Sequence, residues 1–98
     1  MAKRQLPLVH PGEILQEEFL TPMNMSGRAL AFALFVTPAR ISEILGKKRS
    51  VTADTALRLS RYFGTTAQFW LNLQTQYDLG LAKENMAGSL KWIKPRKG

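Results

Sequence analysis

The sequence predicts an all-α domain of five helices followed by a short basic tail. Three observations support this prediction. Between residues 11 and 80, apolar residues recur at the three-and-four spacing of helices. Prolines and glycines stand where such helices would begin and end. The alternation of apolar and polar residues that is typical of strands is absent except over residues 90–93. A length of 98 residues fits one domain with one modest core.

The first helix is expected to begin near Pro11 and to end at Pro22. Proline suits the first helical position, where its missing N–H costs nothing, and a later proline stops the helix. Leu15 and Phe19 lie one turn apart and form a core-facing pair. Residues 1–10 lack periodicity and are expected to form an N-terminal arm.

Two short helices follow and make a helix-turn-helix unit between Ser26 and Leu45. Ser26 is a predicted N-cap, and this helix must end by Phe35. Thr37 followed by proline is typical of a new helix start, and Gly46 is expected to end the third helix in a left-handed conformation. The second helix of such a unit can enter the major groove of DNA.

The fourth helix is expected to run from Thr52 to Gly64. Thr65 and Gln68 could form the capping box of a fifth helix, which weakens after Gly80. The domain is therefore expected over residues 11–80, and residues 81–98 form the basic tail.

Lysine and arginine outnumber acidic residues by fourteen to seven, which gives a net charge of +7. Such a charge favours a polyanionic partner, most commonly nucleic acid. Seven basic residues fall within residues 28–61, and a second basic cluster surrounds Trp92 in the tail. That tail is either simply solvated or, in an alternative hypothesis, part of an RNA-binding or membrane-surface module.

Several classes of protein are excluded by composition. The chain has no cysteine and one histidine, His10, which lies outside any recognisable triad and is interpreted as a helix-entry residue. Neither catalysis nor metal binding is expected, no cofactor is implied, and the function should be equilibrium binding. The sequence shows no signal-peptide h-region and no apolar run long enough to span a bilayer, so we expect a cytoplasmic protein without a membrane partner.

Three stretches of the sequence form a combined pattern: His10-Pro11-Gly12-Glu13-Ile14-Leu15 through Leu20, then Ile41 through Ser50, then Ala56 through Ser60 continuing to Phe69-Trp70-Leu71-Asn72-Leu73-Gln74 and Tyr77-Asp78-Leu79. Together they resemble the HigA group of antitoxins among the XRE-type, lambda-repressor-like helix-turn-helix regulators. The first and last motifs are the most specific, and the resemblance covers about residues 10 to 80.

The resemblance implies a homodimer that represses its own promoter and neutralises a HigB-type toxin, a RelE-like mRNA-cleaving endoribonuclease. A stand-alone regulator of the same fold without a toxin is the alternative. The sequence departs from the family at two places. Phe35 replaces the usual glycine of the turn, where a left-handed backbone would carry strain, and Gly46-Lys47-Lys48 replaces the usual Asn-Gly-Lys.

Ala39, Arg40 and Glu43 are the candidate base-contacting residues, because they face outward near the N-terminal half of the recognition helix. Arg40 can bind guanine O6 and N7, although a phosphate contact or a pairing with Glu43 is the alternative. Glu43 could accept from a cytosine amine or instead orient a neighbouring arginine. Ala39 could contact a thymine methyl group.

Helix N-termini and the loop after the recognition helix supply the candidate phosphate contacts, whose alternative is an ordinary solvated surface. These residues are Ser26, Arg28, Thr37, Lys47, Lys48 and Arg49.

Phe69, Trp70, Leu73 and Tyr77 form an aromatic stripe that serves either the core or a dimer interface, with Trp70 and Tyr77 assigned to the interface. A two-fold dimer would present its recognition helices to half-sites about one DNA turn apart, so a palindromic operator is expected.

Overall fold

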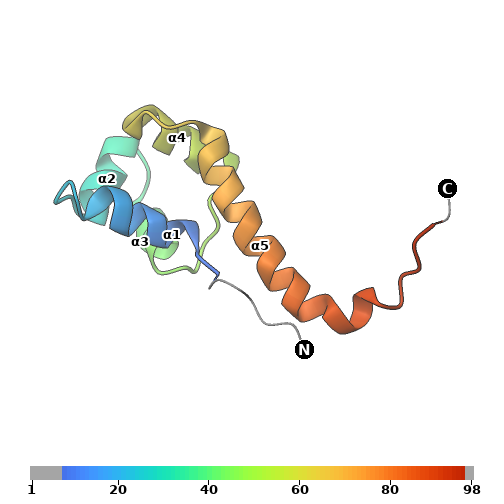
Figure 1. Cartoon of the computed structure of the whole chain (residues 1–98). Coiled ribbons are helices and arrows are strands. Elements are labelled where there is room, and N and C mark those ends of the chain that lie inside the picture. The colour runs from blue at the N-terminus through green and yellow to red at the C-terminus, as the bar shows by residue number, and fades with distance from the viewer. Residues whose placement is uncertain (1–7, 97–98) are drawn as a thin grey trace.

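The structure is a computed structural model that describes residues 8–96, and over this range helices are joined by short turns (Figure 1). The elements are α1 (Pro11–Ile14), η1 (Leu15–Leu20), α2 (Gly27–Leu34), α3 (Pro38–Leu45), α4 (Ala53–Phe63) and α5 (Ala67–Leu90). Because η1 continues α1 directly, the prediction of an all-α fold with five helices is confirmed. The strand considered for residues 90–93 is wrong, since a turn follows the end of α5 there.

The first helical segment begins at Pro11, as predicted. His10 caps it: the amide of Gly12 donates to His10 Nδ1 at 2.8 Å, and Glu13 completes a capping box. The second part, η1, is a π-helix that ends at Leu20, just before Pro22. His10 is thus a helix-entry residue, and it is buried.

Side chains from all the helices meet in one core. Its buried members are Leu15, Leu20, Leu30, Ala31, Leu34, Ile41, Ile44, Val51, Ala56, Leu59 and Trp70. Two contacts set the position of α3 and of the loop after it. Gly12 lies so close to the carbonyl of Ile44 that a Cβ would clash, and the amide of Val51 donates to Gln74 Oε1 at 2.8 Å.

Two helix boundaries differ in detail from the sequence prediction. Gly46 has a φ of −82°, and the left-handed residue after α3 is Lys47, with a φ of 64°. The N-cap of α5 is Thr66, whose Oγ1 accepts from the amide of Phe69. The predicted capping box with Thr65 is wrong because the Thr65 hydroxyl instead accepts from the indole N–H of Trp70 at 2.8 Å.

Helix α5 is longer than the sequence predicted, and it projects away from the other helices (Figure 1). It continues through Gly80 and Gly88 to Leu90. A glycine inside a helix costs only about 1 kcal/mol relative to alanine, so two isolated glycines do not end a helix. Of the predicted tail 81–98, only residues 91–96 are described outside the helix, and residues 1–7 of the predicted arm lie outside the described residues.

Candidate nucleic-acid interface

Helices α2 and α3 form the predicted helix-turn-helix unit. The Ser26 hydroxyl caps α2 by accepting from the amide of Ala29 at 3.0 Å. The Thr37 hydroxyl caps α3 by accepting from the amide of Arg40 at 3.2 Å, and Pro38 occupies the first position of that helix. Both predicted N-caps are confirmed.

The turn between these helices adopts the left-handed conformation at Phe35, with φ 58° and ψ 44°. A side chain at such a position costs roughly 1–2 kcal/mol. The chain therefore tolerates the strain that the sequence predicts for a non-glycine residue in this turn. The Phe35 ring is 88% exposed and gains little from burial. Other contacts must therefore hold the turn.

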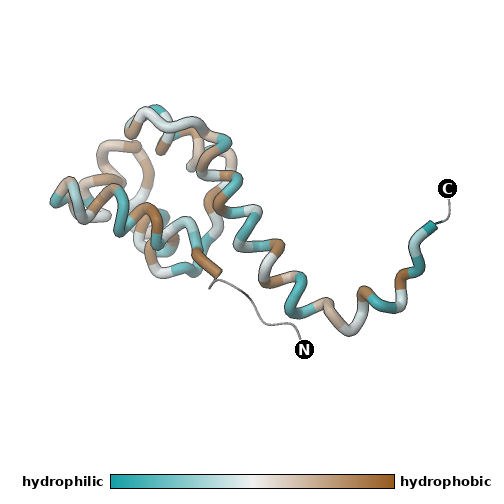
Figure 2. Tube along the Cα trace, viewed as in Figure 1, coloured by the Kyte–Doolittle hydropathy of each residue, from teal (hydrophilic) through white to brown (hydrophobic). Residues whose placement is uncertain are grey.

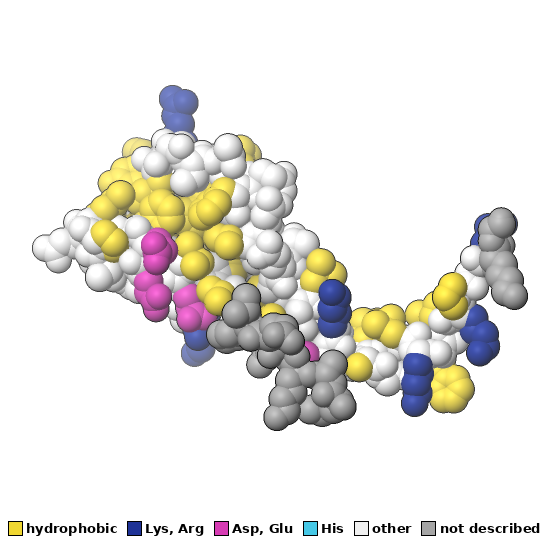
Figure 3. Space-filling model, in the orientation of Figure 1, with side chains coloured by type: hydrophobic (Ala, Val, Ile, Leu, Met, Phe, Trp, Pro, Cys, Tyr) yellow, Lys and Arg dark blue, Asp and Glu magenta, His cyan; other side chains and the backbone are white. Residues whose placement is uncertain are grey.

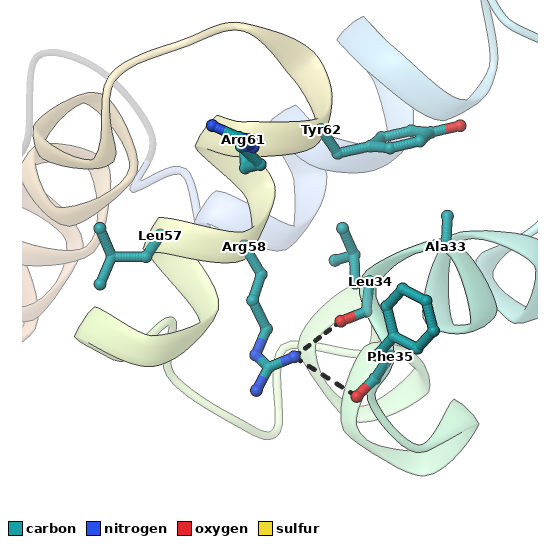
Figure 4. A pocket seen from close by; sticks show the side chains of 7 residues that line it. All are labelled: Ala33, Leu34, Phe35, Leu57, Arg58, Arg61 and Tyr62. Atoms are coloured by element: carbon teal, nitrogen blue, oxygen red, sulfur yellow. Dashed lines mark hydrogen bonds between the residues drawn. The ribbon is translucent and has the colours of Figure 1, made fainter.

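Arg58 of α4 supplies such contacts. Its Nη1 donates to the carbonyl oxygens of Leu34 at 2.8 Å and Phe35 at 3.4 Å, as the dashed lines of Figure 4 show. These carbonyls lie at the C-terminal end of α2, where backbone acceptors lack partners within the helix. Arg58 therefore fastens α4 to the turn that sets the angle between α2 and α3.

Arg40, the principal candidate for base contact, also lies against α4. Its Nη1 is 2.8 Å from Asp54 Oδ1 and 3.5 Å from Thr55 Oγ1. The same Asp54 oxygen accepts from Arg58 Nε at 2.8 Å. Hydrogen bonds from Arg58 and then Arg40 lower the pKa of Asp54 below its ordinary value. Asp54 thus links the candidate base-contacting residue to the arginine that holds the turn.

Glu43 pairs with Arg49 at 2.6 Å and not with Arg40, so the pairing considered for Arg40 is wrong. Glu43 therefore contacts a neighbouring arginine, which is one of the two roles expected for it. Lys47 lies 3.4 Å from Glu13 of α1. Three of the basic residues expected to contact DNA accordingly have acidic partners in the free protein.

The remaining candidates are exposed. Ala39, Ser26, Thr37 and Lys48 are open to solvent, and the guanidinium of Arg28 lies 5.2 Å from the ring centroid of Phe32. Acidic side chains gather near the first helical segment in the view of Figure 3. Acidic residues are therefore most concentrated on a part of the surface that precedes α2 in the chain.

Sequence reasoning missed the roles of Asp54 and Arg58. Arg58 is half-buried against the turn, where its guanidinium donates to the carbonyl of Leu34. The i,i+4 spacing of the two residues on α4 predicts their ion pair. Nothing in the sequence indicates the carbonyl contacts, because these join residues 23 or 24 positions apart.

The aromatic stripe of α5 belongs mostly to the core. Trp70 is fully buried, and its ring centroid lies 5.1 Å from that of Phe19. The assignment of Trp70 to a dimer interface is therefore wrong. Leu73 is partly buried against the core, and Tyr77 packs edge-on against His10. Only Phe69, at 38% exposed, retains a substantial free surface.

Known proteins resemble the chain over nearly its whole length. No protein-family model matches it. Virulence-associated protein I of Dichelobacter nodosus is 59% identical over 83 residues, which are 85% of this chain and 77% of that protein. Antitoxin HigA-1 of Vibrio cholerae is 35% identical over 95 residues, which are 97% of this chain and 90% of that antitoxin. The chain belongs to the HigA family of antitoxins.

A solved structure of a HigA antitoxin supports the assignment. Pseudomonas aeruginosa antitoxin HigA, determined with the higBA promoter, superposes with a TM-score of 0.90 at 42% identity, covering 93% of this chain and 100% of that one. The HigA fold predicted from the sequence is thereby confirmed, and the family is one of helix-turn-helix regulators rather than enzymes. Within residues 8–96, no helix is both long and apolar enough to cross a membrane.

Both departures from the family pattern fall at backbone positions that favour glycine in this HigA-family chain. Phe35 and Lys47 each have a positive φ, the conformation in which glycine carries no strain. The two non-glycine residues thus lie in the turns before and after α3, each in a strained position.

Proposed function

We propose that this protein binds the operator of its own toxin–antitoxin operon and represses it. The observation that carries the proposal is the capped helix α3, held in place by Arg58 and by the close approach of Gly12, with Ala39, Arg40 and Glu43 on its outer side. A net charge of +7 favours association with DNA. The HigA antitoxin from Pseudomonas was determined with its promoter, which supports the same role here.

In this proposal the residues divide into two groups. Ala39, Arg40 and Glu43 contact base edges and provide selectivity. The second group positions the protein on the phosphates without selecting a sequence, and it comprises Ser26, Arg28, Thr37, Lys47, Lys48 and Arg49. A homodimer would present two α3 helices to a palindromic operator.

The experiment is a salt-titrated anisotropy assay with the protein's own upstream DNA and a scrambled duplex. Arg40→Ala should reduce the preference for the operator by about 5- to 150-fold, because a bidentate arginine–guanine contact contributes about 1–3 kcal/mol of discrimination. Lys48→Ala is the matched control: it should weaken binding to both duplexes alike and lower the salt dependence. Equal, weak binding of the wild-type protein to both duplexes would refute operator recognition.

We further propose that the protein neutralises a HigB-type, RelE-like toxin that cleaves mRNA. Membership of the HigA family supports this role, and the test is functional. The product of an adjacent gene should cleave mRNA alone and lose that activity when this protein is added in equimolar amount. Operator binding without a cleaving, neutralised neighbour would instead indicate a stand-alone regulator.

A further inference from the structure

A groove lies between α4 and the C-terminal end of α2, beside the turn that Arg58 holds (Figure 4). Ala33, Leu34 and Phe35 line it on one side, and α4 lines it on the other. Both helices carry hydrophobic positions, and α4 carries hydrophilic positions between them (Figure 2). With a volume of about 480 Å³, the groove has the size of a small-molecule site.

The walls of the groove are apolar side chains that the fold leaves uncovered. Leu57 is 62% exposed and Tyr62 is 46% exposed, and both line the groove from α4. The exposed ring of Phe35 lines it from the turn. Side chains of this size contribute little to stability when they face water. An apolar patch gathered in a hollow is instead typical of a binding surface.

Phe35 is the most unusual of these residues. Its backbone has the left-handed conformation that glycine adopts without strain, and its ring is not buried. Neither backbone preference nor core packing therefore accounts for a phenylalanine at this position. Strained backbone conformations cluster at functional sites and ligand-binding clamps. The ring of Phe35 is thus available to a ligand in the groove.

Two arginines give the groove a positive charge. Arg58 is engaged, because it donates to Asp54 and to the carbonyls of the turn. Arg61, one turn further along α4, is exposed and has no hydrogen-bond or ion-pair partner within residues 8–96. Figure 4 shows its side chain directed away from the carbonyls that Arg58 contacts. In the described part of the chain no acidic residue lines the groove, which therefore offers a guanidinium to an anion beside an apolar surface.

We propose that the groove binds a small aromatic carboxylate. The ring of the ligand contacts Phe35 and Tyr62, because aromatic pairs gain more than their buried area alone. Its carboxylate pairs with the guanidinium of Arg61, whose planar fork matches two carboxylate oxygens. None of the residues that line the groove is a candidate for contact with bases or phosphates. The inference therefore goes beyond the proposed function and does not rest on it.

A protein partner fits the groove less well. An amphipathic helix docks through anchors spread over about two turns, which need a long groove rather than one compact hollow. A surface that carries cations, such as the RNA-binding face of a ribonuclease, is repelled by Arg58 and Arg61. An acidic, apolar peptide is then the competing occupant.

The test is an amide NMR titration of the whole chain, without DNA, with 1-naphthylacetate. The dissociation constant should be on the order of 1 mM or lower, as is typical of so small a ligand, and the shifts should be confined to amides near residues 33–35 and 57–62. 1-Naphthylacetamide, which has the same ring without the charge, should bind about 2- to 5-fold more weakly, the effect of losing one exposed ion pair. Absence of saturable shifts, or equal binding of the neutral amide, would overturn the proposal.

Two variants test the residues assigned to the site. Arg61→Gln should weaken the binding of 1-naphthylacetate by about 2- to 5-fold and leave that of the neutral amide unchanged. Leu57→Glu should weaken the carboxylate more strongly, because it removes part of the apolar wall and places a glutamate four residues before Arg61, where the two side chains pair along the helix. Circular dichroism should show that both variants are folded, since both positions are exposed.

Lys83→Gln is the matched control, because it removes one positive charge from α5, outside the groove. It should bind 1-naphthylacetate as the wild type does. Equal weakening by Lys83→Gln and Arg61→Gln would show that net charge alone attracts the ligand, and it would overturn the site.

A short peptide in which glutamates alternate with phenylalanines tests the competing occupant. Its binding to the groove should be no tighter than that of 1-naphthylacetate. A peptide that shifts the same amides at lower concentration would identify the groove as a protein-docking surface and overturn the proposal.

Discussion

The strained turn at Phe35 allows a quantitative prediction. Replacing Phe35 by glycine removes roughly 1–2 kcal/mol of left-handed strain, and it adds about 0.5–1 kcal/mol of backbone entropy cost. Because the ring is 88% exposed, little apolar burial is lost. We therefore expect Phe35→Gly to stabilise the fold by about 0.5–1 kcal/mol, measured as the free energy of unfolding in urea.

Phe35→Ala is the control, because alanine removes the ring but keeps the Cβ that causes the strain. The glycine variant should be about 1 kcal/mol more stable than the alanine variant, a difference of about 4–8 °C in melting temperature for a domain of this size. The contacts from Arg58 go to main-chain oxygens, so both variants should keep the turn. An alanine variant as stable as the glycine variant would refute the assignment of strain to this backbone conformation.

Two further predictions concern side chains that hold the site in place. Burial lowers the pKa of His10 below its ordinary 6.5, against the opposing effect of Asp78 and Glu13, so the fold favours the neutral ring that caps α1. The contribution of His10 to the free energy of unfolding should therefore be fully present above about pH 6.5 and be lost as the pH falls through the lowered pKa of the folded state. His10→Asn, which can cap the helix without titrating, should make the free energy of unfolding, measured in urea at a series of pH values, fall less steeply toward low pH. A variant whose stability falls as steeply as that of the wild type would contradict this role of His10. Asp54→Ala should reduce the preference for operator over scrambled DNA, because it frees Arg40 from the position that its ion pair sets. In a protein that already carries Arg40→Ala, the same substitution should change that preference little. Independent, additive losses in that double-mutant cycle would show that Asp54 acts other than through Arg40.

Local sequence patterns predicted the beginnings of the helices well. Ser26 and Thr37 cap α2 and α3 as expected, and Gly64 ends α4 in a left-handed conformation. Each of these features depends on residues within one turn of the helix end, where side-chain and backbone preferences act directly. The helix-turn-helix unit could therefore be found without knowledge of the tertiary structure.

Features that depend on distant residues were harder to predict. The partner of Arg40 is Asp54 rather than Glu43, because the packing of α4 against α2 decides which carboxylate lies within reach. The choice between core and interface for Trp70 likewise depends on what the first helical segment places beside it. The length of α5 was underestimated because glycine was treated as a helix end.

The acidic partners of Arg40, Lys47 and Arg49 have a consequence for target search. In the proposed complex with DNA, each of these cations would have to exchange a carboxylate for a phosphate or a base. This exchange offsets part of the electrostatic free energy gained on binding any duplex, whatever its sequence. Hydrogen bonds to bases are gained only at the operator sequence. In the proposed complex, carboxylates on the protein would thus compete with the phosphates of any duplex and weaken binding to random and operator DNA alike, so that the preference for the operator is left to the base contacts.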